Sequence, residues 1–154
     1  MRPAVSSLPP TLVTFLSTAF NTSEPKKYFI NPRCFGDDVA NWLMNELTQR
    51  DASLDPSIGQ EDFGWYVRFR FGRARYDFIV EFRNPDWVGW LQRRRTILEW
   101  LFRVQNKAVQ RDAQLLIHSV LSSSELISDV RWHYKEDFDA LNEGGQIRTI
   151  NQDN

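Results

Sequence analysis

The chain has 154 residues, of which 42% are hydrophobic and 14% aromatic, and its formal net charge is −1. This length and composition predict one folded domain with a substantial core, and they exclude a chain that is disordered throughout. The sequence has no apolar stretch long enough to span a membrane, and its single cysteine excludes an intramolecular disulfide and a zinc site built on several cysteines.

The first 27 residues are expected to form an arm in front of the domain. They contain one short apolar run, residues 11–20, after Pro9 and Pro10. A secretion signal over residues 1–19 is the alternative. Arg2 is the only basic residue before the run, however, and the two prolines stand where the apolar region of a signal would begin. The sequence therefore favours a cytoplasmic protein with its domain over residues 28–142.

The first helix is predicted over residues 37–50. Asp37 and Asp38 suit the positive end of a helix dipole, and apolar residues recur after them at helical spacing. These apolar residues are Val39, Trp42, Leu43 and Leu47. Residues 51–56 then supply the turn-forming side chains that end the helix.

Residues 63–71 and 74–82 predict a β-hairpin that is closed by Gly72 and Arg73. Glycine at the first position of a two-residue loop suits a type II′ turn, and such a loop fixes the register of the strands. One side of the hairpin then pairs apolar residues: Trp65 with Val80, Val67 with Phe78, Phe69 with Tyr76 and Phe71 with Ala74. The other side is polar, and it pairs Tyr66 with Ile79, Arg68 with Asp77 and Arg70 with Arg75.

Residues 87–94 fit either a third strand or the start of a helix. We favour a strand followed by a short helix over residues 97–102, because a single helix from Trp87 to residue 122 would be unusually long. In a strand, Trp87 and Trp90 point to opposite faces, so that one lies in the core and the other is a candidate binding anchor on the open face.

A second major helix is predicted over residues 107–121 and a last strand over residues 130–134. The helix carries an apolar stripe that includes Ala113, Leu116, Ile117 and Val120. In the strand, apolar residues alternate with polar ones, and residues 143–154 form a polar tail. The order helix, three strands, helix, strand predicts an α+β fold, a two-layer sandwich with a mainly antiparallel sheet and both amphipathic helices on one face.

Three short motifs resemble a group of small bacterial proteins of unassigned function. They are Gly36–Leu43 (GDDVANWL), Glu61–Trp65 (EDFGW) and Asp129–Trp132 (DVRW). The resemblance covers residues 28–138. It implies the α+β order, a strand over residues 87–94 and a bacterial, cytoplasmic setting. It implies no activity, cofactor or catalytic residue.

Arginine dominates the polar face of the predicted sheet. Residues 66–103 hold nine arginines against four acidic residues. If all strands share one sheet, this face presents Tyr66, Arg68, Arg70, Arg75, Arg83, Trp90, Arg131 and His133. Arginine and aromatic residues are enriched in protein interfaces, and the guanidinium fork suits carboxylates and phosphates. A solvated face with cross-strand ion pairs, or a coding bias toward arginine, is the alternative interpretation.

Other candidate residues are few. Glu61 and Asp62 form an acidic doublet that could serve in acid–base chemistry or hold Mg²⁺, or could simply cap a loop. His118 and His133 are expected at the surface, without the companion residues of a catalytic site. Cys34 stands near a helix start, where it is either an activated thiol or a packed one.

The leading hypothesis is a non-enzymatic interaction module that binds a protein partner, or a second copy of itself, through the arginine-rich face. The first alternative is a hydrolytic or metal-assisted enzyme that uses Glu61 and Asp62, with a contribution from His133. The second is an anion or nucleic-acid binder, although the net charge of −1 argues against nucleic acid. The sequence indicates no cofactor, no metal and no membrane partner.

Overall fold

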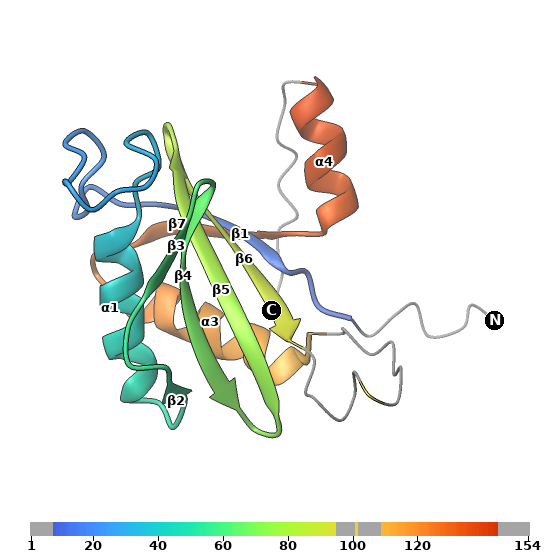
Figure 1. Cartoon of the computed structure of the whole chain (residues 1–154). Helices are drawn as coiled ribbons and strands as arrows, with labels where there is room; N and C mark the ends of the chain where they lie inside the picture. Colours follow the sequence, from blue (N-terminus) through green and yellow to red (C-terminus); the bar gives the residue numbers. More distant parts are fainter. Residues whose placement is uncertain (1–7, 95–100, 102–108, 145–154) are drawn as a thin grey trace.

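The computed structural model describes residues 8–94, 101 and 109–144, with the backbone alone for residues 140–144. Within these residues the chain forms seven strands and three helices (Figure 1). The sheet is antiparallel throughout, so the α+β class and the mainly antiparallel sheet are confirmed. No helix in the described part of the chain is long and apolar enough to cross a membrane.

The strands form one sheet in the order β2-β4-β5-β6-β1-β7, and β3 pairs with β4 beside this path. Their bounds are Leu12–Leu16 (β1), Ser53–Leu54 (β2), Gly59–Glu61 (β3), Gly64–Phe71 (β4), Ala74–Arg83 (β5), Asp86–Arg94 (β6) and Ser128–His133 (β7).

The predicted hairpin is the centre of this sheet. Strands β4 and β5 pair from Trp65 opposite Val80 to Phe71 opposite Ala74, in the predicted register. Gly72 has a φ of 62°, the left-handed backbone that the first position of a type II′ turn requires. The apolar side of the hairpin is buried, and the arginines project from the other face.

Residues 87–94 are a strand, as predicted, within β6. Trp87 is fully buried among Phe15, Phe20 and Phe82, whereas Trp90 lies half-buried on the opposite face. The two tryptophans therefore point apart, as the strand prediction requires. The short helix expected over residues 97–102 lies outside the described residues, apart from Leu101.

Two helices cover the apolar face of the sheet. Helix α1 (Asp37–Thr48) follows Gly36 and packs on β4, while α3 (Arg111–Ser123) packs on β7, and the two helices touch each other. Both were predicted. Helix α3 begins four residues later than expected, and its buried stripe includes Ala113, Ile117 and Val120.

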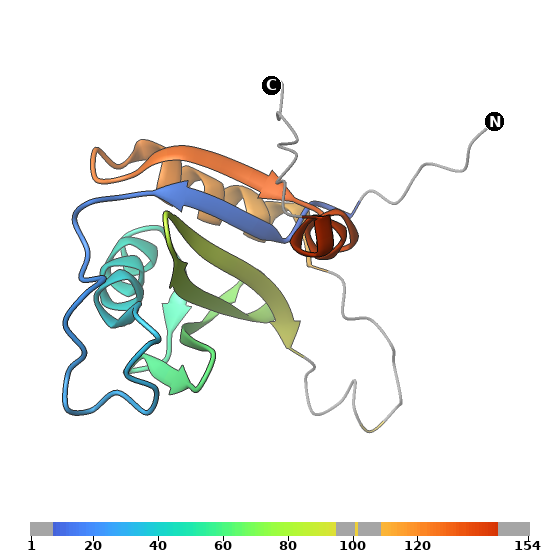
Figure 2. The ribbon, with the colours of Figure 1, turned by 90° about the horizontal axis from the view of Figure 1, so that it is seen from above.

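The expected N-terminal arm is wrong for residues 12–16. These residues form β1, which lies between β6 and β7 and pairs with both (Figure 2). Val13 and Phe15 point into the main core, and Leu12 and Thr14 are buried on the other face. The domain therefore begins well before residue 28.

Helix α4 (Lys135–Gly144) was not predicted. Figures 1 and 2 both show it well away from α1, at the other end of the sheet. Its buried Phe138 contacts Leu12 and Val88, which project from the face opposite α1 and α3. The expected polar tail therefore begins no earlier than residue 145, and the sheet is covered in part on its second face.

Candidate functional site

One row of side chains crosses four strands on the open face of the sheet. The register places Ser53 opposite Arg70, Arg70 opposite Arg75, and Arg75 opposite Arg94. Paired residues of antiparallel strands project to the same face, and neighbouring strands lie about 4.8 Å apart. Three arginines therefore stand side by side, an arrangement in which like charges repel and destabilise the sheet.

Arg68 lies two residues before Arg70 on the same face of β4, and Asp77 links it to Arg94 of the row. The Asp77 carboxylate contacts Arg68 Nε at 3.2 Å and Arg94 Nε at 3.6 Å. Burial raises the pKa of Asp77, and the guanidinium groups of Arg94 and Arg68 oppose that rise. The guanidinium of Arg68 also lies 4.7 Å from the ring centre of Tyr66, a cation–π contact that helps to hold the guanidinium in place. We call Arg68, Arg70, Arg75 and Arg94 the arginine cluster.

Arg70 and Arg75 carry charge that this cluster does not compensate. Both are exposed, and neither has an acidic partner among the residues that the structure describes. They line an open hollow of about 290 Å³ together with Arg68, Arg94, Ser53 and Asp55. A carboxylate or phosphate in this hollow would meet several guanidinium donors and the Ser53 hydroxyl.

The predicted binding face is smaller than the sequence indicated. Arg83 lies at the far end of β5, where it pairs with Glu81, and Arg131 pairs with Asp129 on β7. Strands β4 and β7 are separated by three others, about 19 Å in all. Arg131 therefore shares a face with the arginine cluster but does not lie beside it.

His133 is buried and not at the surface. Alternation along β7 correctly places it on the face of the arginines, but α4 folds over this part of the face. Its Nε2 lies 3.0 Å from Thr14 Oγ1, and its ring packs on Phe138. His133 is thus part of the contact between the sheet and α4 and cannot belong to a solvent-exposed interface.

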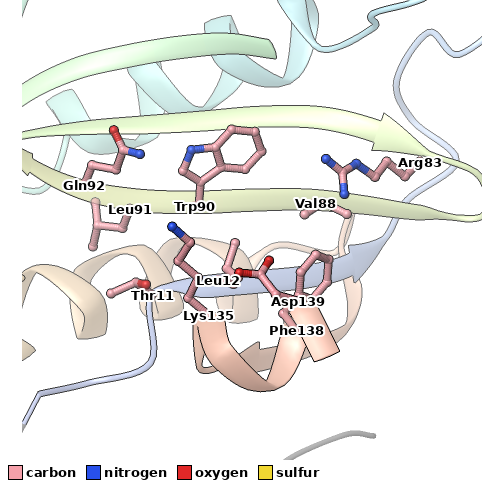
Figure 3. A pocket seen from close by; sticks show the side chains of 10 residues that line it. All are labelled: Thr11, Leu12, Arg83, Val88, Trp90, Leu91, Gln92, Lys135, Phe138 and Asp139. Carbon is pink, nitrogen blue, oxygen red and sulfur yellow. The ribbon is translucent and has the colours of Figure 1, made fainter. Parts of the chain in front are cut away.

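Trp90 occupies the centre of the open face. It stands opposite Ile79 on β5 and Leu12 on β1, and its ring stacks on that of Phe63 at 6.3 Å. One side of the indole lines a second hollow beneath α4 (Figure 3). Tyr66, Arg68, Arg70 and Arg75 are thus brought together. Trp90 lies four residues along β6 from Arg94 and lines the other hollow, and Arg131 and His133 lie two strands beyond β6.

The acidic doublet lies at the turn between β3 and β4. Glu61 and Asp62 are exposed, and the Asp62 carbonyl accepts a hydrogen bond from Asn31 Nδ2 at 2.7 Å. His133 belongs to β7, so the doublet and this histidine do not meet. Within the described ranges no group of three or more His, Cys, Asp or Glu side chains could hold a metal ion.

His118 is half-buried on α3 and accepts a hydrogen bond from the indole of Trp132. Trp132 Nε1 lies 3.0 Å from His118 Nδ1, and the Ser122 hydroxyl is also within reach of the ring. Trp132 is fully buried, so this bond satisfies the only hydrogen-bond donor of its side chain. His118 therefore fastens α3 to β7.

Cys34 is a packed thiol. It lies in the core, and burial raises its pKa to about 11, with smaller contributions from Glu81 and Asp62 that the charge of Arg83 opposes. Of the two interpretations that the sequence allowed for Cys34, the activated thiol is therefore wrong and the packed thiol is correct. A nearby backbone contact explains why the residue is held inside, since its carbonyl accepts a hydrogen bond from Trp65 Nε1 at 2.9 Å.

We expect Cys34 to react with DTNB about a hundredfold more slowly than an unfolded-chain thiol at about pH 8, because two pKa units reduce its thiolate fraction by that factor. The rate should rise as the pH approaches 11. Since the chain has one cysteine, the reaction reports on this site alone. The same protein in guanidinium chloride is the control, and an equally fast reaction of the folded protein would contradict the burial.

Sequence reasoning missed Arg94. Alternation along residues 90–94 could have found it, because Trp90, Gln92 and Arg94 share one face of β6.

Comparisons with known protein families, with curated proteins and with solved structures found no match.

Proposed function

We propose that the protein is a non-enzymatic interaction module whose arginine cluster binds an acidic segment of a protein partner. The observation that carries this proposal is the row of Arg70, Arg75 and Arg94 on three adjacent strands. A sheet gains no stability from adjacent like charges, and within the described residues only Arg94 of the three has an acidic partner, Asp77. The charges of Arg70 and Arg75 are therefore best explained by a ligand that supplies the missing anions.

The form of the site favours carboxylates of a polypeptide over nucleic acid. The hollow is open, as suits side chains of an extended segment, and guanidinium forks bind carboxylates in bidentate fashion. Nucleic-acid-binding sheets present several exposed rings for base stacking. Beside the cluster, Tyr66 already carries Arg68 on its ring. We propose the same bacterial, cytoplasmic setting that the sequence resemblance implies.

The test is binding of a fluorescein-labelled hexaglutamate peptide, followed by fluorescence anisotropy. We expect the double substitution Arg70→Gln/Arg75→Gln to weaken binding at least about tenfold, since each lost charge-assisted hydrogen bond is worth roughly 1.5 kcal/mol or more. Both arginines are exposed, so folding should be preserved, and relief of their repulsion should leave stability equal or slightly higher.

A matched control removes the same charge elsewhere. Arg33→Gln/Arg131→Gln lowers the net charge equally, but both residues lie away from the cluster, so binding should be unchanged. An equal loss in both double variants would show a non-specific charge effect.

Two other outcomes would change the identity of the ligand. Tighter binding of an oligothymidylate of the same charge would replace the proposal with a phosphate binder. If the unchanged protein sediments as a dimer and the Arg70→Gln/Arg75→Gln variant as a monomer, the partner is a second copy of the chain.

A further inference from the structure

A hollow of about 310 Å³ lies between α4 and the sheet (Figure 3). Its volume is at the lower end of the range for small-molecule sites. Its floor is apolar, because Leu12, Val88 and Phe138 form a buried cluster of their own with Trp90 packed against it. An apolar group of modest size would therefore be desolvated here on several sides.

Two opposite charges of α4 line the same hollow. Lys135 and Asp139 are one helical turn apart, and Figure 3 shows Lys135 reaching from α4 toward β6 beside Trp90, with Asp139 near Leu12 and Phe138. Within the residues that the structure describes, the two do not pair with each other or with any other charged group.

The third charged residue of the lining is already paired. Arg83 contacts Glu81, its neighbour on the same face of β5, so its charge is largely compensated. The charges left to meet a ligand are one ammonium and one carboxylate on a single face of α4. Gln92 adds an amide that can donate and accept at the opposite rim.

We infer that this hollow binds a zwitterionic α-amino acid with an apolar side chain. The apolar floor would hold the side chain against Trp90 and Phe138, Lys135 would contact the carboxylate, and Asp139 would contact the ammonium. A ligand with a carboxylate alone would leave Asp139 without a partner and beside a like charge, and a simple amine would do the same at Lys135. This inference does not depend on the arginine cluster.

The probe is L-phenylalanine, compared with 3-phenylpropionate, which lacks the ammonium, and phenethylamine, which lacks the carboxylate. Binding is followed in ¹⁵N-labelled full-length protein by the indole signal of Trp90 and the side-chain amide signal of Gln92. We expect saturable shifts of both signals with phenylalanine, and about tenfold weaker binding of each analogue, the usual effect of one lost charge-assisted hydrogen bond.

Protein variants complete the cycle. Lys135→Met keeps most of the side-chain stem and removes the charge, so it should weaken phenylalanine about tenfold while leaving phenethylamine unchanged. Asp139→Asn should act in the opposite sense and leave 3-phenylpropionate unweakened. Both residues are exposed, so the fold should tolerate either change. The controls are Lys27→Met and Asp137→Asn, the latter on the same helix but outside the hollow.

Three results would overturn the inference. The first is the absence of saturable shifts at Trp90 and Gln92 with phenylalanine. The second is equal affinity for all three probes, which would mean that only the apolar floor contributes. The third is equal loss in Asp139→Asn and Asp137→Asn, which would assign the effect to the net charge of α4.

Discussion

Replacing Val13 with proline is expected to destabilise the protein by about 4 kcal/mol or more, which is most of the stability of a domain at the low end of the ordinary range. Val13 is the second residue of β1 and stands opposite Gly89 on β6 and Trp132 on β7. In a strand with a neighbour on each side every backbone N–H belongs to one ladder or the other. Proline removes this donor and places its ring against the adjacent strand.

Val13→Ala separates the side-chain effect from the backbone effect. It keeps the N–H and removes two buried methyl groups, which should cost about 2 kcal/mol. Urea unfolding followed by circular dichroism measures both variants, and loss of soluble folded protein in the proline variant counts as the expected result. A proline variant no less stable than the alanine variant would show that residues 12–16 are not part of the sheet.

Gly89→Ala is expected to cost about 3 kcal/mol, which is large for a single added methyl group. A Cβ at Gly89 would lie 2.3 Å from Cζ of Phe78, and its next two contacts are also atoms of that ring. Phe78 is fully buried, so its ring has no free space to enter. The methyl group therefore displaces a ring at the centre of the core.

The double variant Gly89→Ala/Phe78→Leu tests this cause. A smaller side chain at residue 78 makes room for the methyl group, so the double substitution should cost less than the sum of the single ones. Gly72→Ala is a useful contrast. Its Cβ meets nothing nearer than 3.8 Å, so only the positive φ opposes it, at about 1 kcal/mol. Strict additivity in thermal or urea unfolding would contradict the proposed clash.

The hairpin was predictable in full because its signals are local. A two-residue loop at Gly72 and strict alternation on both sides leave one register that buries the rings and exposes the arginines. The same alternation predicted that Trp87 and Trp90 point apart. Helix α1 was equally accessible, since its apolar residues recur on one stripe after Asp37 and Asp38.

The two elements that were missed carry no such pattern. Strand β1 is buried on both faces, so residues 12–16 read as a short apolar run without alternation. Helix α4 is mostly polar, and Phe138 is the anchor that its described side chains bury. Each becomes recognisable only through its partners, which lie far away along the chain.

This limit also explains the errors in the candidate site. The alternation of side chains along β7 placed Arg131 and His133 on the correct face, but it gives no information about distance across the sheet. Inserting β1 between β6 and β7 moves Arg131 away from the arginine cluster. The return of α4 buries His133. Neither β1 nor α4 changes the position of Arg70 relative to Arg75, because these two residues pair with each other within the hairpin.

The position of β1 has a consequence during synthesis. Thr14 and His133, which are in contact, are separated by 119 positions, so one edge of this apolar strand stays open until almost all of the described chain has left the ribosome. An unpaired edge is a template for pairing with a neighbouring nascent chain. The interval at greatest risk of aggregation is therefore set by how quickly β7 is translated, and a slow stretch of translation between β6 and β7 would lengthen it.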